Sequence, residues 1–359
     1  SRLLNYDPNS GEISYIGDGS SGQVLQTDGS GILSWSSSAS GVSQLNDLSD
    51  ALIEDNSVYV GSVPSSTNLA QYNVGLGKNV LSNITTGDRN VGMGFKALNA
   101  NTSGRDNTAL GREALMQNTD GEFNVAIGAG ALLSSTSADK NVAIGYGALY
   151  NNLTGGNNVA IGYNALQNNT TSTENTAIGT FALQYNVTGY RNTALGNFAN
   201  GSNQSGQKNA VVGYAAFSGS STGNFNSILG YAAGERAQSD GNTFMGYYAG
   251  IAGSSHPYVS GGYNTAIGYN AFLSGASTTN ETVIGTSATG QGSNTVTLGN
   301  SAVSAVYMSE DAGATIYAGG MDLKTNSTSD GSIVSLANSD DSHRLRLFSG
   351  HSADPNPFM

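Results

Sequence analysis

The chain lacks cysteine altogether and contains only five prolines, one tryptophan and three histidines among its 359 residues. Without cysteine the fold has no disulfides, so its stability has to come from packing. Charged residues make up 11% of the chain, against about a quarter in an ordinary globular protein. Low charge is common in membrane proteins, but the sequence has no run of about 18 apolar residues. We therefore expect no membrane insertion.

Basic residues and catalytic motifs are also scarce. Thirteen lysines and arginines face 25 aspartates and glutamates, and the formal net charge of -12 repels phosphate backbones. His256, His343 and His351 are far apart in the sequence and have no metal-ligand spacing. The chain has no nucleophile elbow, phosphate-binding loop or Cys/His cluster. We therefore expect a protein that is not an enzyme, binds no nucleic acid and needs no metal or cofactor.

Glycine, serine, threonine and asparagine supply the polarity instead. Glycine alone contributes 50 residues, about twice the usual share of roughly 7%. These four residue types favour turns and compete with helix, so the composition predicts an all-β chain. Both ends of the sequence are abrupt, and we expect the chain to be a fragment of a longer protein.

Asparagine recurs at every seventeenth position through the middle of the sequence. The asparagines are Asn73, Asn90, Asn107, Asn124, Asn141, Asn158, Asn175, Asn192, Asn209 and Asn226. Each opens a short phrase of the type Asn-Val-Ala-Ile-Gly, as at 141–145. The closing glycine continues at looser spacing through Gly246, Gly268, Gly285 and Gly299, which gives 14 repeats. A short period kept over this length predicts a solenoid whose coils stack at about 4.8 Å, roughly 60 Å in total.

Within a repeat, the first and third side chains after the asparagine, such as Val142 and Ile144, share one face of a short strand. The residue between them is mostly alanine, as at Ala143, so we expect an alanine-lined face that packs closely against another subunit. A second phrase, for example Ala148 with Leu149, predicts a second strand in each coil. Weighing apolar burial against chain entropy leaves a single stack short of stability, so we expect a homotrimer.

The phrase Asn-Val/Thr-Ala-Ile-Gly with a following alanine resembles the head repeat of trimeric autotransporter adhesins, which is a left-handed parallel β-roll. That head repeat is shorter, near the 14-residue step from Gly285 to Gly299. The 17-residue form, as at 141–157, is more similar to repeats of bacteriophage and other viral tail-fibre proteins. The segments 3–15 and 21–35 are likewise similar to β modules of phage fibres. The resemblance implies a left-handed roll of about 14 coils in a homotrimeric fibre.

The sequence divides into four parts. Residues 1–36 predict a small β module with Trp35 in its core. A serine-rich linker, followed by a collar and cap, is expected at 37–70. The roll occupies 71–305, and 306–359 predict the start of a β-rich shaft or tip.

Three sets of side chains along the repeats have structural and functional interpretations. The asparagine column is best explained as a structural ladder in which each amide bonds to the copies above and below it. Charges beside it alternate between coils, so that Arg89 is predicted to lie on Asp106 and Glu174 on Arg191. This alternation indicates ion pairs that fix the register, in preference to a catalytic carboxylate pair. Tyrosines after the glycine, such as Tyr146, form a column that either stabilises its neighbours, which we favour, or binds sugars.

One interval breaks the regular scaffold. The step from Gly246 to Gly268 is longer than the regular period and contains His256, Pro257 and Tyr258. Loops that project from rigid scaffolds often carry recognition, so these three residues form a candidate recognition loop. An insertion that is merely tolerated is the other interpretation.

Three functions remain open from the sequence. The resemblance favours a structural and adhesive fibre of a virion, a bacteriophage tail fibre that holds a receptor-binding tip. Its partners would be itself, other virion tail proteins and a host cell-surface receptor, with glycans among the candidates. A trimeric autotransporter-type adhesin head on the bacterial cell surface is the second. A tailspike glycan depolymerase is the weakest, because hydrolysis needs two carboxylates about 5 to 9.5 Å apart, whereas these acids lie on turns beside basic residues.

Overall fold

The computed structural model describes residues 3–6, 13–16, 23–27, 33–37, 51–54, 56–61, 64, 69–252, 257–304 and 306. The chain divides into two units, residues 1–304 and 305–359. Apart from Val306, the shaft or tip expected at 306–359 lies outside the described residues. The side chain of Trp35 and residues 38–50 of the expected linker also lie outside them.

Two hairpins make up the described part of the N-terminal segment. Strand β1 (Leu3–Tyr6) pairs antiparallel with β2 (Ile13–Ile16). Strand β3 (Gln23–Thr27) pairs antiparallel with β4 (Leu33–Ser37). Each hairpin is a two-stranded sheet of its own.

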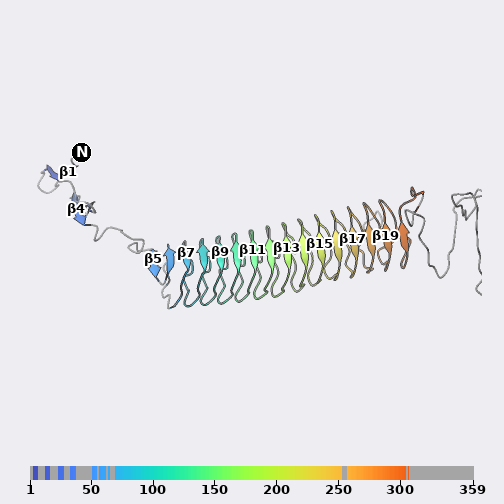
Figure 1. Cartoon of the computed structure of the whole chain (residues 1–359), viewed down its shortest axis with the longest axis horizontal. Helices are drawn as coiled ribbons and strands as arrows, with labels where there is room; N and C mark the ends of the chain where they lie inside the picture. The colour runs from blue at the N-terminus through green and yellow to red at the C-terminus, as the bar shows by residue number, and fades with distance from the viewer. Residues whose placement is uncertain are drawn as a thin grey trace, which may run out of the picture. The chain divides into compact units, whose positions relative to one another are not determined.

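The other described strands form one sheet of 16 strands, in the order of the chain from β5 to β20 (Figure 1). Strand β5 (Ala51–Glu54) is antiparallel to β6 (Ser57–Val60), and each later strand is parallel to the one before it. The later strands are β7 (Val74–Leu76), β8 (Val91–Met93), β9 (Thr108–Leu110), β10 (Val125–Ile127), β11 (Val142–Ile144), β12 (Val159–Ile161), β13 (Thr176–Ile178), β14 (Thr193–Leu195), β15 (Ala210–Val212), β16 (Ser227–Leu229), β17 (Thr243–Met245), β18 (Thr265–Ile267), β19 (Thr282–Ile284) and β20 (Val296–Leu298). The described fold is an all-β parallel solenoid of about 14 coils without helix, which confirms the architecture predicted from the asparagine period.

The asparagine period sets the register of this sheet. From β7 to β16 each residue pairs with the residue one period later, as Val142 does with Val159 and Ala143 with Ala160. The step between paired residues is shorter than the period at β17 and β20 and longer at β18. The length differences are absorbed in the turns, so the strands stay aligned along the whole stack.

Each regular coil has one strand, and the prediction of a second strand was wrong. The segment around Ala148 and Leu149 is a series of turns. Gly147 and Leu149 have positive φ values of 63° and 52° on either side of Ala148, so the backbone cannot extend there. Its N–H groups still bond to the next coil, as from Leu149 N to Ala165 O at 3.0 Å. The turn segment therefore stacks from coil to coil as a strand would, without strand geometry.

The glycine that closes each strand is required by the stacking. Gly145 has a φ of 131°, a conformation that side chains disfavour. A Cβ at Gly145 would also lie 2.5 Å from the carbonyl oxygen of Gly162 in the next coil. Both constraints recur along the stack, which explains why glycine marks the period as clearly as asparagine does.

The strand alanines line the interior of the coils, which corrects the expectation of an alanine face between subunits. Ala143, Ala148 and Leu149 are completely buried within the single chain, and the equivalent residues repeat along the core. Alanine fills this interior strand position in most coils, and Val211, Ile228 and Phe244 fill it in later ones. Val142 and Ile144 occupy the opposite face of the strand, which is only partly buried. The larger aliphatic residues therefore point outward.

Candidate functional site

The asparagine column forms a continuous ladder of buried hydrogen bonds. Asn158 N donates to Asn141 Oδ1 at 2.9 Å, and Asn141 Nδ2 donates to Asn124 Oδ1 at 3.2 Å. Asn141 Nδ2 also donates to the carbonyl oxygen of Gly155 at 2.9 Å. All ten side chains found from the spacing have at most 2% of their surface exposed. The amides bond to one another inside the coils, where an external ligand cannot reach them.

The ladder continues beyond these ten asparagines at both ends. Ser57 begins it by accepting the N–H of the first asparagine, and Asn242 and Asn264 extend it past the irregular coils. Glu281, which is completely buried, ends it. Its carboxylate accepts the backbone N–H of Gly292 at 2.8 Å. The other carboxylate oxygen accepts the backbone N–H of Ser274 at 3.0 Å, so both oxygens are engaged outside the ladder, which ends at this residue.

A second buried asparagine column runs through the return turns and was missed in the sequence. It consists of Asn101, Asn118, Asn152, Asn169, Asn186 and Asn203. Asn169 Nδ2 donates to Asn152 Oδ1 at 2.7 Å and to the carbonyl oxygen of Ser172 at 2.9 Å. These asparagines recur with the same period as the first column, so the sequence already contained the signal. It was hidden because the neighbouring return positions are also rich in asparagine, threonine and glycine.

The second ladder is interrupted at Ser135 and ends at Ser220, the two positions where serine replaces asparagine. Serine is too short to reach the amide of the adjacent coil. Asn118 Oδ1 and Ser135 Oγ are therefore buried without a hydrogen-bond partner in the structure, and so is Asn203 Oδ1 beside Ser220. Unpaired buried polar atoms weaken a fold by about 1–3 kcal/mol each.

The alternating charges lie as the sequence predicts. The ion pairs between adjacent coils are Arg89 with Asp106 at 2.7 Å, Arg105 with Glu122 at 2.9 Å and Arg191 with Glu174 at 2.7 Å. The hydrogen bond from the Arg89 guanidinium holds the pKa of Asp106 below its ordinary value, and Arg191 lowers the pKa of Glu174 in the same way. These carboxylates are engaged by guanidinium groups on the surface, which fits a role in fixing the register.

Aromatic rings form a longer column than the tyrosine spacing indicates. It consists of Tyr146, Tyr163, Phe181, Phe198, Tyr214, Tyr231, Tyr247 and Tyr269. Successive ring centroids are 5.0–6.4 Å apart. Most neighbours are stacked, so the rings cover one another's faces and leave mainly their edges exposed. Because a sugar would need those faces, the column favours the stabilising interpretation.

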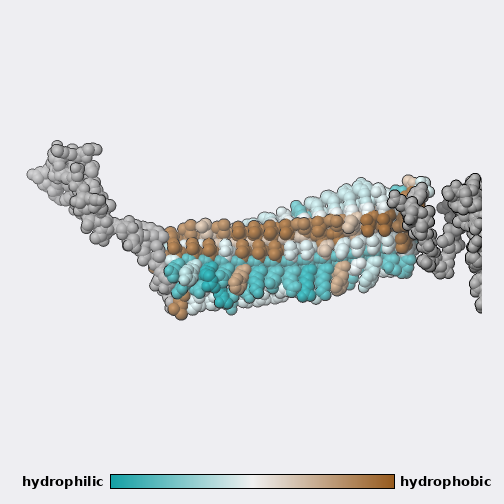
Figure 2. All heavy atoms as spheres, in the orientation of Figure 1, coloured by the Kyte–Doolittle hydropathy of each residue, from teal (hydrophilic) through white to brown (hydrophobic). Residues whose placement is uncertain are grey.

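The outward face of the sheet carries an exposed apolar stripe. The third residue after the ladder position is aliphatic or methionine in every strand from β7 to β20: Leu76, Met93, Leu110, Ile127, Ile144, Ile161, Ile178, Leu195, Val212, Leu229, Met245, Ile267, Ile284 and Leu298. We call this set the apolar stripe; Figure 2 shows the apolar band that runs along the stack. Many of its members, such as Leu195, have about two fifths of their surface exposed. Apolar patches of this extent mark interaction surfaces.

The lengthened coil between β17 and β18 contributes part of the candidate recognition loop. His256 lies outside the described residues, whereas Pro257 and Tyr258 are exposed. The Tyr258 ring centroid is 5.7 Å from the Arg236 guanidinium carbon, a distance suited to a cation–π contact. The loop therefore places an aromatic ring and a cation together on the surface.

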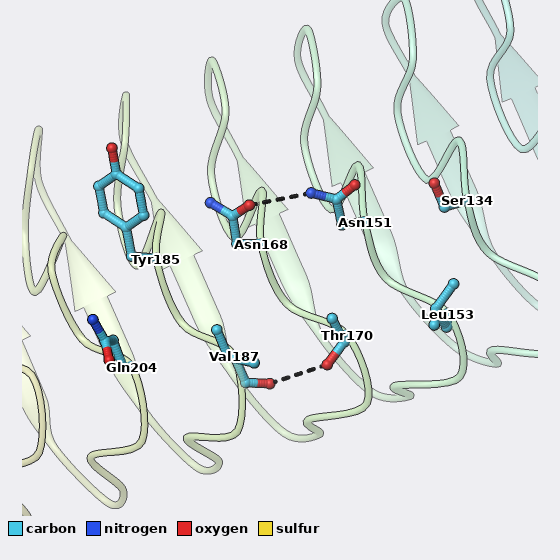
Figure 3. Close-up of a pocket in the computed structure, with 8 residues that line it drawn as sticks. All are labelled: Ser134, Asn151, Leu153, Asn168, Thr170, Tyr185, Val187 and Gln204. Atoms are coloured by element: carbon cyan, nitrogen blue, oxygen red, sulfur yellow. Dashed lines mark hydrogen bonds between the residues drawn. The ribbon is translucent and has the colours of Figure 1, made fainter.

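A shallow groove follows the turns of the coils. Figure 3 shows its first part, lined by Ser134, Asn151, Leu153, Asn168, Thr170, Tyr185, Val187 and Gln204. Its second part begins at the same Tyr185 and continues past Ser202 and Arg236 to Tyr258. We call the whole the turn groove. It joins the candidate recognition loop to the neighbouring regular coils, which the sequence alone did not connect.

No group of three or more metal-ligating residues, and no helix long and apolar enough to cross a membrane, occurs in the described part of the chain. Comparison with protein-family models, curated protein sequences and solved structures finds no significant match. The apolar stripe and the turn groove are the surface features of the described residues that bear on function.

Proposed function

We propose that the chain is a structural and adhesive fibre protein of a virion, a bacteriophage tail fibre. Three copies pack through their apolar stripes as left-handed rolls around a common axis and hold a receptor-binding tip. The apolar stripe carries this proposal, because its 14 positions contain no polar residue. The similarity of the 17-residue repeat and of the N-terminal segments to phage fibres supports the virion assignment.

The size of the stripe is adequate for assembly. Burying a whole leucine or isoleucine side chain is worth about 1.5–3 kcal/mol, so covering the remaining exposed part of one stripe residue is worth about 0.5–1 kcal/mol. Summed over the stripe this is on the order of 10 kcal/mol, comparable with an association cost of about 4–15 kcal/mol. A few coils would not hold chains together, whereas the full stack can.

The neighbouring first-position column gives each copy a second contact surface. Val142 and Val159 are examples of this column, which lies beside the stripe on the same strand face. Two adjacent columns let each copy contact one neighbour through each column around a shared axis. The long parallel stack supplies the stiffness that a fibre needs, because each coil is bonded to the next by backbone and asparagine ladders.

Two leucines with the same exposure provide a test. Leu195 in the stripe and Leu153 in the turn groove are each 44% exposed. We expect sedimentation to give a trimer for the native chain and for Leu153→Asp, and a smaller species with retained β circular dichroism for Leu195→Asp. Three carboxylates forced together without water cost several kcal/mol each. A native chain that sediments as a monomer refutes the trimer, and equal behaviour of the two variants refutes the stripe as its interface.

The site of action needs a separate measurement. Immunogold electron microscopy with antibodies against the roll, on virus particles and cells from the source, is expected to label thin fibres on the virions. Label on the bacterial envelope would overturn the virion assignment in favour of the surface adhesin.

A further inference from the structure

The turn groove has a regular, neutral lining in its first part. Ser134, Asn151 and Asn168 occupy the same position in successive coils, and Thr170 and Gln204 lie on the opposite side (Figure 3). The coils repeat at about 4.8 Å, so hydroxyl and amide groups recur at that interval. Each such group can donate and accept hydrogen bonds, and none of the residues lining this part is charged.

Part of this hydrogen-bonding capacity is already used along the groove. Asn151 Nδ2 donates to Asn168 Oδ1 at 3.1 Å, and Asn168 Nδ2 donates to the carbonyl oxygen of Gln184 at 3.0 Å. These bonds align the amides in a row (Figure 3). A fixed row is preorganised, so a ligand that binds it does not have to order the side chains first.

Aromatic rings interrupt the regular lining at the middle and at the far end. Tyr185 replaces the serine and asparagines of the same position, is 52% exposed, and projects from its turn in Figure 3. Unlike the stacked aromatic column, it has no ring partner in the described part of the chain. Tyr258 stands at the far end beside Arg236. Tyr185 therefore presents ring faces that the aromatic column does not, whereas the Arg236 guanidinium lies over one face of the Tyr258 ring.

We propose that the turn groove binds a neutral polysaccharide lying along the fibre axis, which deepens the proposed adhesive function and rests on it. Sugar hydroxyls suit the amide and hydroxyl row, and the apolar C–H faces of sugar rings suit Tyr185, Leu153 and Val187. The coil spacing is close to the length of one pyranose unit, so successive sugars meet equivalent groups. The acidic chain disfavours polyanions. An extended peptide would need an unpaired strand edge, which a groove lined by turns does not offer.

The turn groove and the proposed trimer interface consist of different residues. None of its lining residues belongs to the apolar stripe or to the strand column beside it, because none of them lies in a strand. Binding and assembly therefore use different residues and can be perturbed separately.

The test is binding of the purified full chain to a microarray of neutral and acidic bacterial polysaccharides. Tyr185→Ala removes the exposed ring of the groove, and Phe123→Ala removes a ring of similar exposure outside it. We expect binding to at least one neutral polysaccharide, weakened tenfold or more by Tyr185→Ala and unchanged by Phe123→Ala. Sedimentation of each sample reports assembly independently.

The outcomes separate the two proposals. A trimer that binds no neutral polysaccharide, that prefers acidic ones, or that binds equally well with Tyr185→Ala overturns the groove proposal and leaves the fibre intact. A monomer that still binds a neutral polysaccharide through Tyr185 supports the groove and overturns the trimer.

Discussion

The break in the second asparagine ladder at Ser135 permits a quantitative test of what the ladders contribute. Replacing Ser135→Asn supplies an amide between Asn118 Oδ1, which is buried and unpaired, and Asn152 Nδ2, which bonds only to Gly155 O. The coils on either side carry asparagine at this position, so the backbone geometry suits it. The substitution pairs Asn118 Oδ1 and removes the unpaired Ser135 Oγ.

The residue three positions later differs in this coil from most coils with asparagine in the column, although Asn169 keeps its ladder bonds with Ser172 there. The coils with asparagine in this column mostly have glycine three residues later, and a Cβ on Gly155 would lie 2.5 Å from Asn152 Oδ1. In the interrupted coil that glycine is replaced by Ala138. We therefore expect Ser135→Asn to reach its full effect only together with Ala138→Gly. Pairing a buried polar atom is worth about 1–3 kcal/mol, and the glycine costs about 0.5–1 kcal/mol in chain entropy.

The assay is urea unfolding of the native chain, the two single variants and the double variant. We expect the double variant to be more stable than the native chain by about 1–2 kcal/mol, Ala138→Gly alone to be less stable, and the pair to be coupled favourably. Ser134→Asn makes the same chemical change on the adjacent, partly exposed residue and should have little effect. Additive single effects, or a double variant no more stable than the native chain, would refute the steric explanation.

Two further predictions concern the turns and the ion pairs. Lys140 has a φ of 58°, and Asn157 takes the same position in the next coil. Asparagine adopts this left-handed conformation more readily, so Lys140→Asn should raise the free energy of unfolding by about 0.5–1 kcal/mol. The control Lys140→Gln removes the same charge without favouring this conformation and should not raise it. Asp106 has its pKa lowered by Arg89, so the pair stabilises the fold above about pH 4 and the stabilisation is lost as the pH falls through the lowered pKa. Unfolding midpoints measured from pH 7 to pH 2 should fall less steeply for Asp106→Asn, and identical profiles would show that the pair does not matter.

The period, the number of coils, the register and the first ladder follow from the sequence because one residue type recurs at one spacing. Asparagine and glycine each have a geometric reason to recur, and Gly145 shows it: its neighbour in the next coil leaves no room for a side chain. The hydrophobic pattern alone predicted less of the structure. It separated the two faces of a strand correctly but assigned the alanine face to a contact between subunits, whereas that face lines the interior of the coil.

Hydrophobicity could not predict which face of each strand points into the coil. Ile144 is larger and more apolar than Ala143, and in most strands the larger residue is buried. Here Ala143 is inside and Ile144 outside, and the interior position is mostly alanine, with Val211, Ile228 and Phe244 buried there in later coils. The second strand was predicted wrongly for a related reason, because Ala148 and Leu149 are both buried while Leu149 takes a left-handed conformation that no sequence pattern reveals.

Because the small strand residues lie inside and the larger ones outside, different residues stabilise the fold of one chain and its assembly. Within one chain, Ala143, Leu149 and the asparagine ladders complete a core that is buried without a partner. The largest aliphatic side chains of the strands are left for contacts outside the coil. Substitutions in the core should therefore impair both the monomer and its assembly, whereas substitutions in the apolar stripe, such as Leu195→Asp, should impair assembly alone. A chain that lost its fold on the loss of one stripe residue would contradict this division, since the coil would then depend on its neighbours for its own core.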